Sequence, residues 1–268
     1  MRKTPNSADP DAQFDADAPT DPKTVSGDTT TKILVIGDHH GARPLFEELL
    51  EKVGDQKWHG VLLVGDLAPH TKTKSPPLEL VEAERDYLLR SLEPLSAPVL
   101  WVPGNHDPRE LDGPGNIDRR SAEIAGLSIY GIGGAGPASF GFPYEWTDEE
   151  IRDLDPSPHQ ILLSHCPPYG ARDRVLWGRR VGSRALTELA PRFRVFVCGH
   201  IHEASGVQAF GDKTQGPQTL VLNAGSLGKP FPVLQHGEIH HHADDTFTIR
   251  YVSHIKGKVH ELREERPL

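Results

Sequence analysis

The sequence predicts an α/β fold in which two mixed β-sheets pack face to face between helices, in four layers ordered αββα. From Lys32 onward, short β-branched and aliphatic runs alternate with longer stretches whose apolar residues have helical spacing. Nearer the C-terminus, apolar runs follow one another without a helical stretch between them, which indicates added strands. The chain shows no internal repeat and no linker within this core. We therefore expect one domain over residues 32–255.

The predicted strands of the first half each end in a small residue followed by a polar one. They are residues 33–36 before Gly37-Asp38, residues 61–64 before Gly65-Asp66, and residues 99–102 before Gly104-Asn105. Between them, residues 44–52 and 78–92 have the apolar spacing and charge content of surface helices. The pattern in this half therefore predicts strands that alternate with helices, with a polar residue just after each strand.

The second half repeats this arrangement and then changes to strands alone. Residues 161–163 lead into His165, and residues 195–197 lead into His200. The segments 219–223, 231–240 and 246–252 follow without a helical pattern between them. We expect these three segments to be consecutive and antiparallel strands.

Two terminal segments fall outside the predicted domain. Residues 1–31 are rich in Asp, Thr, Pro and Ala, and Phe14 is their only aromatic residue. Such a segment buries too little apolar surface to offset its ordering entropy, so we expect a disordered tail. Residues 256–268 are interpreted as a C-terminal extension.

Composition limits the classes of partner. A formal charge of −9 and a pI near 5.9 argue against strong nucleic-acid binding through the overall field. The start of the chain lacks the apolar run of a secretory signal, and no run is long enough to span a bilayer, so no membrane partner is expected. Two cysteines in apolar or motif-bearing segments fit a reducing compartment, and we predict a cytoplasmic protein.

Seven polar residues after the predicted strands have side chains suited to binding metal ions. They are Asp38, His40, Asp66, Asn105, His165, His200 and His202. Open sheets present such residues just beyond the carboxyl ends of their strands, so these side chains can converge on one crevice. Oxygen and nitrogen ligands without a thiolate suit Mn, Fe or Zn. Two such ions together can activate a water molecule and bind phosphoryl oxygens, which predicts hydrolysis of a phosphate ester.

The motifs around these residues resemble, in order, those of the calcineurin-like metallophosphoesterases. They are Gly37-Asp38-His39-His40-Gly41, Gly65-Asp66, Gly104-Asn105-His106-Asp107, Ser164-His165 and Gly199-His200-Ile201-His202. The resemblance implies a metallo-dependent phosphatase-like fold and a dinuclear centre whose bridging hydroxide attacks phosphorus. It implies a first ion on Asp38, His40, Asp66 and His202, and a second on Asp66, Asn105, His165 and His200. It also implies catalytic roles for His106 at the leaving group and for Asp107 in orienting the His106 ring.

One departure from the family pattern bears on the substrate. Protein phosphatases of this superfamily continue the second motif with an Asp and an Arg, whereas Asp66 is followed here by Leu67-Ala68-Pro69-His70. The chain looks more similar to small phosphodiesterases related to the class III cyclic-nucleotide enzymes, and residues 223–226 resemble the strand and turn that closes this core. We therefore expect a small phosphodiester substrate, with a cyclic nucleotide as one option. A phosphomonoesterase with the same site and a catalytically silent metal-binding scaffold are the alternatives, and the sequence leaves open whether the chain forms a homodimer.

Other polar residues near the motifs are weaker candidates. His39, Arg172 and Arg174 are predicted substrate contacts, and Arg179 and Arg180 belong to the same basic loop. His70 is either a residue behind the metal ligands or a solvated loop residue. The run His240-His241-His242 is expected to lie exposed at a sheet edge rather than to bind metal, because successive strand residues face opposite sides. The glycine-rich run 133–136 predicts a tight turn.

Overall fold

Twelve strands form two six-stranded sheets in the computed structural model, which describes residues 30–69, 71, 74–156, 159–214, 216–255 and 257–264. The first sheet contains, in spatial order, β12 (Lys258–Arg263), β11 (Phe247–Ser253), β10 (Gln235–His241), β1 (Thr31–Ile36), β2 (Gly60–Leu63) and β3 (Val99–Trp101). The second contains β4 (Ser121–Ile124), β5 (Leu127–Ile132), β6 (Ile161–Ser164), β7 (Val195–Cys198), β9 (Thr219–Asn223) and β8 (Gly206–Phe210).

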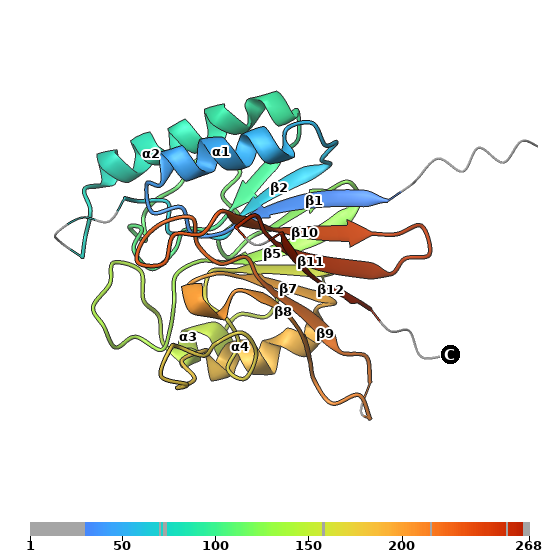
Figure 1. Ribbon diagram of the computed structural model, residues 1–268. Coiled ribbons are helices and arrows are strands. Elements are labelled where there is room, and N and C mark those ends of the chain that lie inside the picture. The colour runs from blue at the N-terminus through green and yellow to red at the C-terminus, as the bar shows by residue number, and fades with distance from the viewer. Residues whose placement is uncertain are drawn as a thin grey trace, which may run out of the picture.

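Helices cover the outer face of each sheet (Figure 1). The first sheet is covered by α1 (Arg43–Val53) and α2 (Leu78–Leu92), and the second by α3 (Asp148–Arg152) and α4 (Arg184–Leu189). Short 3₁₀ helices occupy Glu93–Leu95, Ala190–Arg192 and His202–Ala204. The predicted αββα architecture is therefore confirmed.

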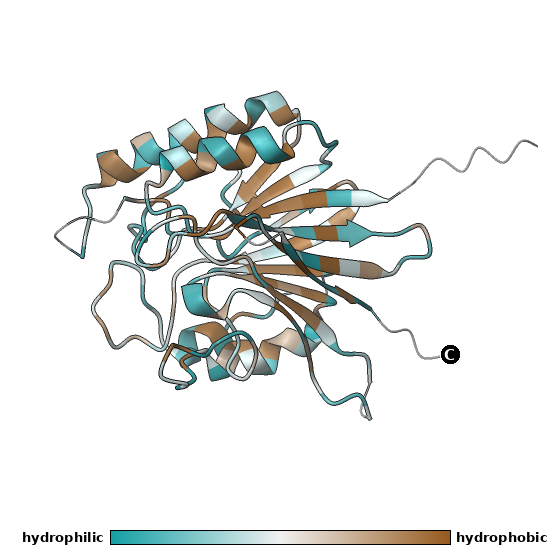
Figure 2. Ribbon diagram, viewed as in Figure 1, coloured by the Kyte–Doolittle hydropathy of each residue, from teal (hydrophilic) through white to brown (hydrophobic). Residues whose placement is uncertain are grey.

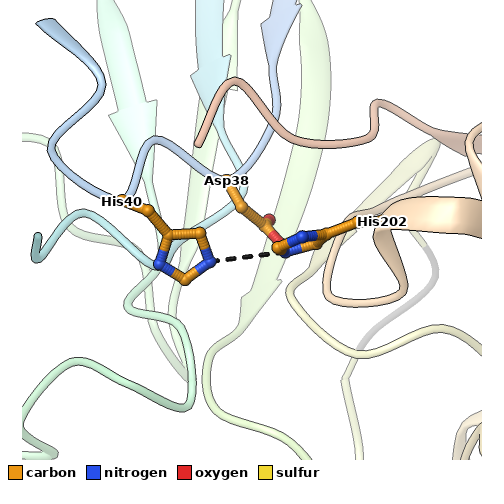
Figure 3. Close-up of side chains that lie close together, drawn as sticks. All are labelled: Asp38, His40 and His202. Carbon is orange, nitrogen blue, oxygen red and sulfur yellow. Dashed lines mark hydrogen bonds and ion pairs between the residues drawn. The ribbon is translucent and has the colours of Figure 1, made fainter. Parts of the chain in front are cut away.

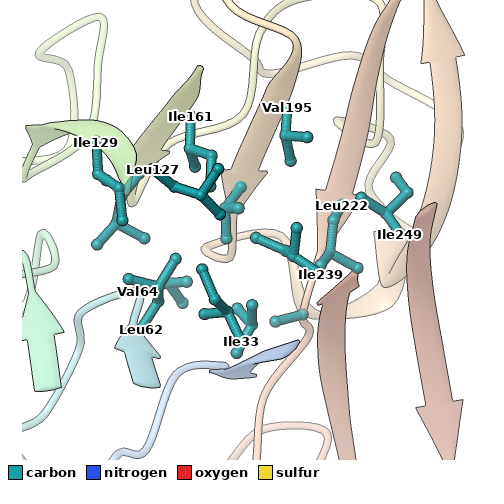
Figure 4. Packing of buried hydrophobic residues seen from close by; sticks show 14 of the residues in the cluster. Ile33, Leu62, Val64, Leu127, Ile129, Ile161, Val195, Leu222, Ile239 and Ile249 are labelled. Carbon is teal, nitrogen blue, oxygen red and sulfur yellow. The ribbon is translucent and has the colours of Figure 1, made fainter. Parts of the chain in front are cut away.

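Alternation of side chains along the strands produces the layers. Ile33 and Val35 of β1 enter the core between the sheets, whereas Leu34 and Ile36 pack against the helices. All four are buried, because each face of the sheet is covered. Apolar residues dominate the strands in Figure 2, and Figure 4 shows both sheets contributing to the central core. Burial of each such side chain stabilises the fold by about 1.5–3 kcal/mol.

Strand direction places the site. β1, β2 and β3 run parallel to one another, as do β5, β6, β7 and β9. The carboxyl ends of parallel neighbours lie at the same edge of a sheet, so the loops that leave them gather there. These loops carry all seven residues predicted to bind metal ions.

Three expectations about the C-terminal half need revision. Residues 219–223 form β9, which pairs in parallel with β7 in the second sheet rather than antiparallel with β10. The strand predicted to begin at Phe231 begins at Gln235, after a loop that contains Pro230 and Pro232. Part of the expected C-terminal extension, Lys258–Arg263, forms β12 and pairs with β11. The predicted disordered tail falls almost entirely on residues 1–29, outside the described residues.

Candidate metal centre

Asp38, His40 and His202 meet just beyond the carboxyl end of β1. The Nε2 atom of His202 lies 2.9 Å from Oδ2 of Asp38 and 3.3 Å from Nε2 of His40. Figure 3 shows the two rings and the carboxylate directed at one another. Asp38 is fully buried, and ligand atoms of all three residues lie within 4.8 Å of one another. This arrangement can accept one metal ion.

Asp66 joins this group to a second one. Its Oδ2 atom lies 3.4 Å from Nε2 of His40 and 3.5 Å from Nε2 of His165. The same His165 nitrogen lies 2.9 Å from Oδ1 of Asn105. Asp66 is therefore the shared carboxylate between two sets of candidate ligands.

The tautomer of His165 explains why its Nε2 atom is available to an ion. The Nδ1 atom lies 2.9 Å from the carbonyl oxygen of Val64, so a proton on Nδ1 is donated there. In that tautomer Nε2 carries a lone pair, which points toward the oxygens of Asn105 and Asp66. Acceptors that face acceptors repel one another unless a cation or a proton lies among them.

His200 completes the second group. Its backbone N–H donates to Oδ2 of Asp38 at 2.9 Å, and its ring centroid lies 5.0 Å from that of His165. Burial, together with the neighbouring His165, lowers the pKa of His200 to about 3. The imidazole is consequently neutral near pH 7, which is the form that binds metals.

Three of the candidate ligands have a left-handed backbone that residues with a Cβ rarely adopt. The φ angles of His40, Asp66 and His200 are 47°, 49° and 63°. Each such residue costs on the order of 1 kcal/mol, and such strain clusters at functional sites. Here it turns three side chains out of the strand direction and toward a common point.

Two glycines allow backbone to approach the carboxylates closely. A Cβ at Gly104 would lie 2.0 Å from Oδ1 of Asp66, and a Cβ at Gly199 would lie 2.2 Å from Oδ1 of Asp38. Any side chain at either position would displace the carboxylate.

The chemistry of this donor set fits divalent cations. Oδ1 of Asp38 is buried and accepts no hydrogen bond from the described residues. Although burial by itself would raise the pKa of Asp66, the nearby His165 and His40 hold it well below its usual range. Two buried carboxylates of this kind are costly without positive charge, and ions held by the histidine nitrogens would provide it.

His106 and Asp107 adopt different environments. His106 is partly exposed, its ring lies 5.3 Å from the His40 ring, and its backbone N–H donates to Oδ1 of Asp66 at 2.9 Å. Asp107 is buried, and its carboxylate accepts backbone N–H bonds from Leu67, Ala68 and Gly104. These contacts tie together the loops that carry Asp66 and Asn105. Burial and the charge of Asp66 raise the pKa of Asp107 to about 6.

The turn after β9 forms hydrogen bonds to the two loops that carry Asp38 and His200. The side-chain amide of Asn223 donates to the carbonyl oxygens of Gly199 and Ile201, each at 3.1 Å. The hydroxyl of Ser226 donates to the carbonyl oxygen of Asp38 at 3.0 Å. Residues 223–226 resemble the family in sequence, but their role in holding two ligand loops emerges only from the structure.

Comparison with known proteins identifies the family. The family model described as calcineurin-like phosphoesterase matches residues 31–204. The chain belongs to the calcineurin-like phosphoesterase family. An uncharacterized protein of Methanocaldococcus jannaschii is 30% identical over 210 residues, which are 72% of this chain and 87% of the relative. The predicted family is thus confirmed.

Solved structures share the phosphoesterase fold at low sequence identity. A dimetal phosphatase from Danio rerio superposes with a TM-score of 0.58 at 12% identity, covering 87% of this chain and 98% of the other. A Thermus thermophilus protein superposes with a TM-score of 0.51 at 15% identity, covering 87% of this chain and 99% of the other. At these identities the similarity shows the fold alone.

The candidate metal centre opens on one side into a pocket of about 660 Å³. Asn105 and His200 form part of its wall, and Arg179 and Arg180 also line it. The two arginines predicted to contact substrate, Arg172 and Arg174, instead line a separate pocket of about 180 Å³, which Arg180 shares. The basic loop thus divides between two pockets, and its later arginines are the ones beside the metal centre.

His39 does not lie where a substrate contact requires. The residue is 1% exposed, its ring packs edge-on against Phe46 of α1 at 5.3 Å, and its Nδ1 atom lies 3.4 Å from Glu84 of α2. Burial lowers its pKa to about 4 despite that carboxylate. His39 points into the helical layer because it alternates with Asp38 and His40, and the expected substrate contact is replaced by a structural one.

The histidine run His240–His242 is not at a sheet edge. β10, which ends at His241, lies between β1 and β11, so these residues follow or belong to an interior strand. His240 pairs with Glu238, His241 with Asp245, and His242 with Thr248. His70 lies outside the described residues. None of the helices in the described part of the chain combines the length and apolar character needed to span a bilayer.

Proposed function

We propose that this phosphoesterase is a metal-dependent phosphodiesterase with a dinuclear centre. Asp38, His40, Asp66 and His202 would hold one ion, and Asp66, Asn105, His165 and His200 the other. One observation carries the proposal: Oδ2 of Asp66 lies 3.4 Å from one set of candidate ligands and 3.5 Å from the other. A shared carboxylate between two sets of lone pairs is the arrangement that a pair of divalent ions requires.

The donor set suggests which ions bind. Four imidazoles, two carboxylates and one amide oxygen suit manganese, iron or zinc better than calcium or magnesium, which prefer all-oxygen sites. Bound ions of this kind supply Lewis acidity and an activated water molecule. We propose manganese as the first ion to test.

The protein's own groups would position the phosphate and support the leaving oxygen. His106 is the one candidate catalytic side chain that is partly exposed, and its ring lies beside that of His40. It can therefore donate a proton to an oxygen that departs from phosphorus. The bond from its backbone N–H to Asp66 fixes the position of His106 relative to the shared carboxylate. Asp107 would act as a positioning residue for the two loops that it joins.

Two features favour a diester over a monoester. Leu67 and Ala68, which follow the shared carboxylate, are each 1% exposed, so neither of these two positions supplies a cationic side chain for a second phosphate charge. A diester carries one negative charge near pH 7, whereas a monoester carries nearly two. The pocket beside Asn105 and His200 also provides room for a second substituent on phosphorus.

Paired assays test this assignment. Metal-loaded protein is expected to hydrolyse bis-p-nitrophenyl phosphate with a higher kcat/KM than p-nitrophenyl phosphate, and a chelator should abolish both rates until manganese is restored. A large preference for the monoester would reverse the assignment. Two bound ions with no hydrolysis of either ester would instead support a silent scaffold.

We also propose that the protein works in the cytoplasm. Cys166 and Cys198 are free and buried. Burial raises the pKa of Cys166 to about 12, so this thiol stays protonated and unreactive. Free thiols of this kind suit a reducing compartment.

A further inference from the structure

The pocket beside the metal centre has the size of a site for a substrate group. Its volume of about 660 Å³ falls within the range of small-molecule sites, roughly 300–1,000 Å³. Asn105 and His200 form one end, so a phosphoester held by the candidate ligands can extend a substituent into it. The other walls come from residues 135–148 and from residues 169–184.

Aromatic side chains line this pocket from both loops. Phe140 is 65% exposed and Trp177 is 80% exposed, although each is a large apolar residue. Phe142 also lines the pocket, and its ring centroid lies 4.4 Å from that of His106. Aromatic surface therefore runs from the candidate leaving-group histidine into the pocket. Exposed aromatic residues gathered at a cavity indicate a binding surface.

Hydrogen bonds hold both aromatic walls in place. The carboxylate of Glu145 accepts the backbone N–H groups of Ser139, Phe140 and Gly141. On the other side, a turn closed by Gly178 N–H to Val175 O presents Trp177. Glu203, the neighbour of the candidate ligand His202, accepts the backbone N–H of Leu176 in this turn at 2.9 Å. Glu145 therefore fixes the shape of the loop that carries Phe140, and Glu203 ties the turn that carries Trp177 to the segment of His202.

The charged side chains that line the pocket are three arginines and two carboxylates. Both carboxylates already accept hydrogen bonds from the protein. Arg184 lies over the ring of Tyr169 at 4.4 Å, and Arg180 pairs with Asp173. Glu145 is occupied by backbone N–H groups, and Asp148 accepts the hydroxyl of Ser183. Aromatic faces combined with guanidinium groups are typical of sites that stack a planar ring, such as a nucleobase.

We propose that this pocket binds a planar aromatic substituent of the phosphodiester, of nucleoside size, against Phe140, Phe142 and Trp177. The inference rests on the proposed function, because it assigns the group attached to the phosphate. A nucleoside and a simple aryl group share this chemistry, and the assay below separates them. A lipid chain fits less well, because the space is a pocket with arginines rather than an extended apolar groove.

Three diesters with a common leaving group test the substituent. p-Nitrophenyl esters of thymidine 5′-phosphate, phenyl phosphate and methyl phosphate differ only in the group that remains on phosphorus. We expect kcat/KM for the thymidine ester to exceed that of the methyl ester roughly 10- to 100-fold, as expected for one stacked base. The phenyl ester should fall between them if the pocket recognises more of the nucleoside than its ring, and should match the thymidine ester if any aryl group suffices. Equal values for all three esters would overturn the proposal.

Trp177→Ala and Leu176→Ala provide a matched pair of variants. Both residues are exposed in the same turn, but only Trp177 lines the pocket. Trp177→Ala should raise KM for the thymidine ester about tenfold more than KM for the methyl ester, whereas Leu176→Ala should alter neither value. If both variants instead lose binding to anionic phospholipid vesicles and keep the ester preference, the turn contacts a membrane surface and the proposal is overturned.

Tryptophan fluorescence measures nucleotide binding without hydrolysis, so it tests the pocket independently of the proposed phosphodiesterase activity. Trp58, Trp101 and Trp146 are buried, so Trp177 is the exposed tryptophan of the chain. Thymidine 5′-monophosphate should quench the emission of the wild type and of Leu176→Ala, and should have little effect on Trp177→Ala. Quenching without hydrolysis of any ester would refute the proposed function but support the pocket. Hydrolysis without ester preference or quenching would refute the pocket alone.

Discussion

Two clusters of histidines and carboxylates lie in this protein, and they differ in whether hydrogen-bond donors satisfy them. At the candidate metal centre, Nε2 of His165 faces the oxygens of Asn105 and Asp66. On β10 and β11, the buried Glu238 accepts from His236, His240 and Arg250. In the described part of the chain, the groups suited to holding a metal ion fall at the first cluster.

This difference teaches how to read a histidine-rich sequence. The second cluster is also rich in histidines, but its central carboxylate is paired with the guanidinium group of Arg250 and hydrogen-bonded to two imidazoles of the protein. The first cluster leaves Oδ1 of Asp38 buried without a donor from the described residues. A cation is needed where acceptors outnumber donors, and not simply where histidines are frequent.

The largest effect is expected from Asp66→Asn, which breaks the first cluster at its shared carboxylate. An amide retains the size of the side chain but removes the charge, so both ions should be lost. Hydrolysis of bis-p-nitrophenyl phosphate should fall by about a thousandfold or more. Metal analysis after gel filtration measures the loss directly. Glu238→Gln is the matched control and should retain the metal content of the wild type; two ions bound to Asp66→Asn would contradict the comparison.

His106→Asn is expected to have the next largest effect. The variant keeps a polar group of similar reach but cannot donate a proton to the leaving oxygen, so kcat should fall about a hundredfold. Its metal content should stay unchanged, because no candidate ligand is removed. A diester with a good leaving group, such as p-nitrophenolate, should suffer less than an alkyl diester. Equal losses for both substrates would remove the proton-donor role.

Metal ions should raise the free energy of unfolding by binding at the first cluster, and the second cluster should make no contribution to this effect. At a manganese concentration about one hundred times the Kd, linkage predicts about 2.7 kcal/mol of stabilisation, or roughly 5–10 °C in Tm for a domain of this size. Differential scanning calorimetry should show this shift in the wild type and in Glu238→Gln. Asp66→Asn, which lacks the carboxylate shared by both ions, should show little or none. A full shift in Asp66→Asn would place the ions elsewhere.

The smallest effect is expected from Glu238→Gln, which tests the second cluster by itself. Burial favours a raised pKa for Glu238, but hydrogen bonds from His236 and His240 and the charge of Arg250 hold it well below the usual range. The variant should lose about 2 kcal/mol of stability at pH 7, typical of hydrogen bonds to a charged group.

The pH dependence of that loss follows from the depressed pKa. The stabilisation is present above the unfolded-state pKa of about 4.3 and is lost as the pH falls toward the folded value. The difference between wild type and variant in urea unfolding should therefore shrink from pH 7 to about pH 3. A difference that grows as the pH falls would mean that Glu238 is not ionised in the native state.

Local patterns in the sequence were sufficient for the αββα layers and for the loops that bear Asp38, Asp66 and Asn105. Each strand segment and the polar residue that follows it are close in sequence, so their geometry is determined locally. The position of β10 was not predictable in this way, because its place between β1 and β11 depends on pairing between distant segments. That is why His240–His242 were wrongly expected at an edge.

The aromatic pocket was missed for a different reason. Phe140 and Trp177 lie in loops without periodicity, and an isolated exposed aromatic residue carries no signal by itself. Only the approach of two loops that are distant in sequence brings them to one cavity. The pocket that Arg172 and Arg174 line was not predictable for the same reason. The sequence of a basic loop does not show which of two cavities its arginines face.

The pairing of β1 with β10 has a consequence for the order of folding. The backbone N–H of Asp38 donates to the carbonyl oxygen of Gly225, and the carbonyl oxygen of Asp38 accepts the hydroxyl of Ser226. β1 itself pairs with a strand that begins at Gln235. During synthesis, the first candidate ligand therefore emerges from the ribosome long before the segments that support it. Contacts of such long sequence separation slow folding. The nascent chain consequently cannot complete the support of the candidate metal centre until β10 has been translated.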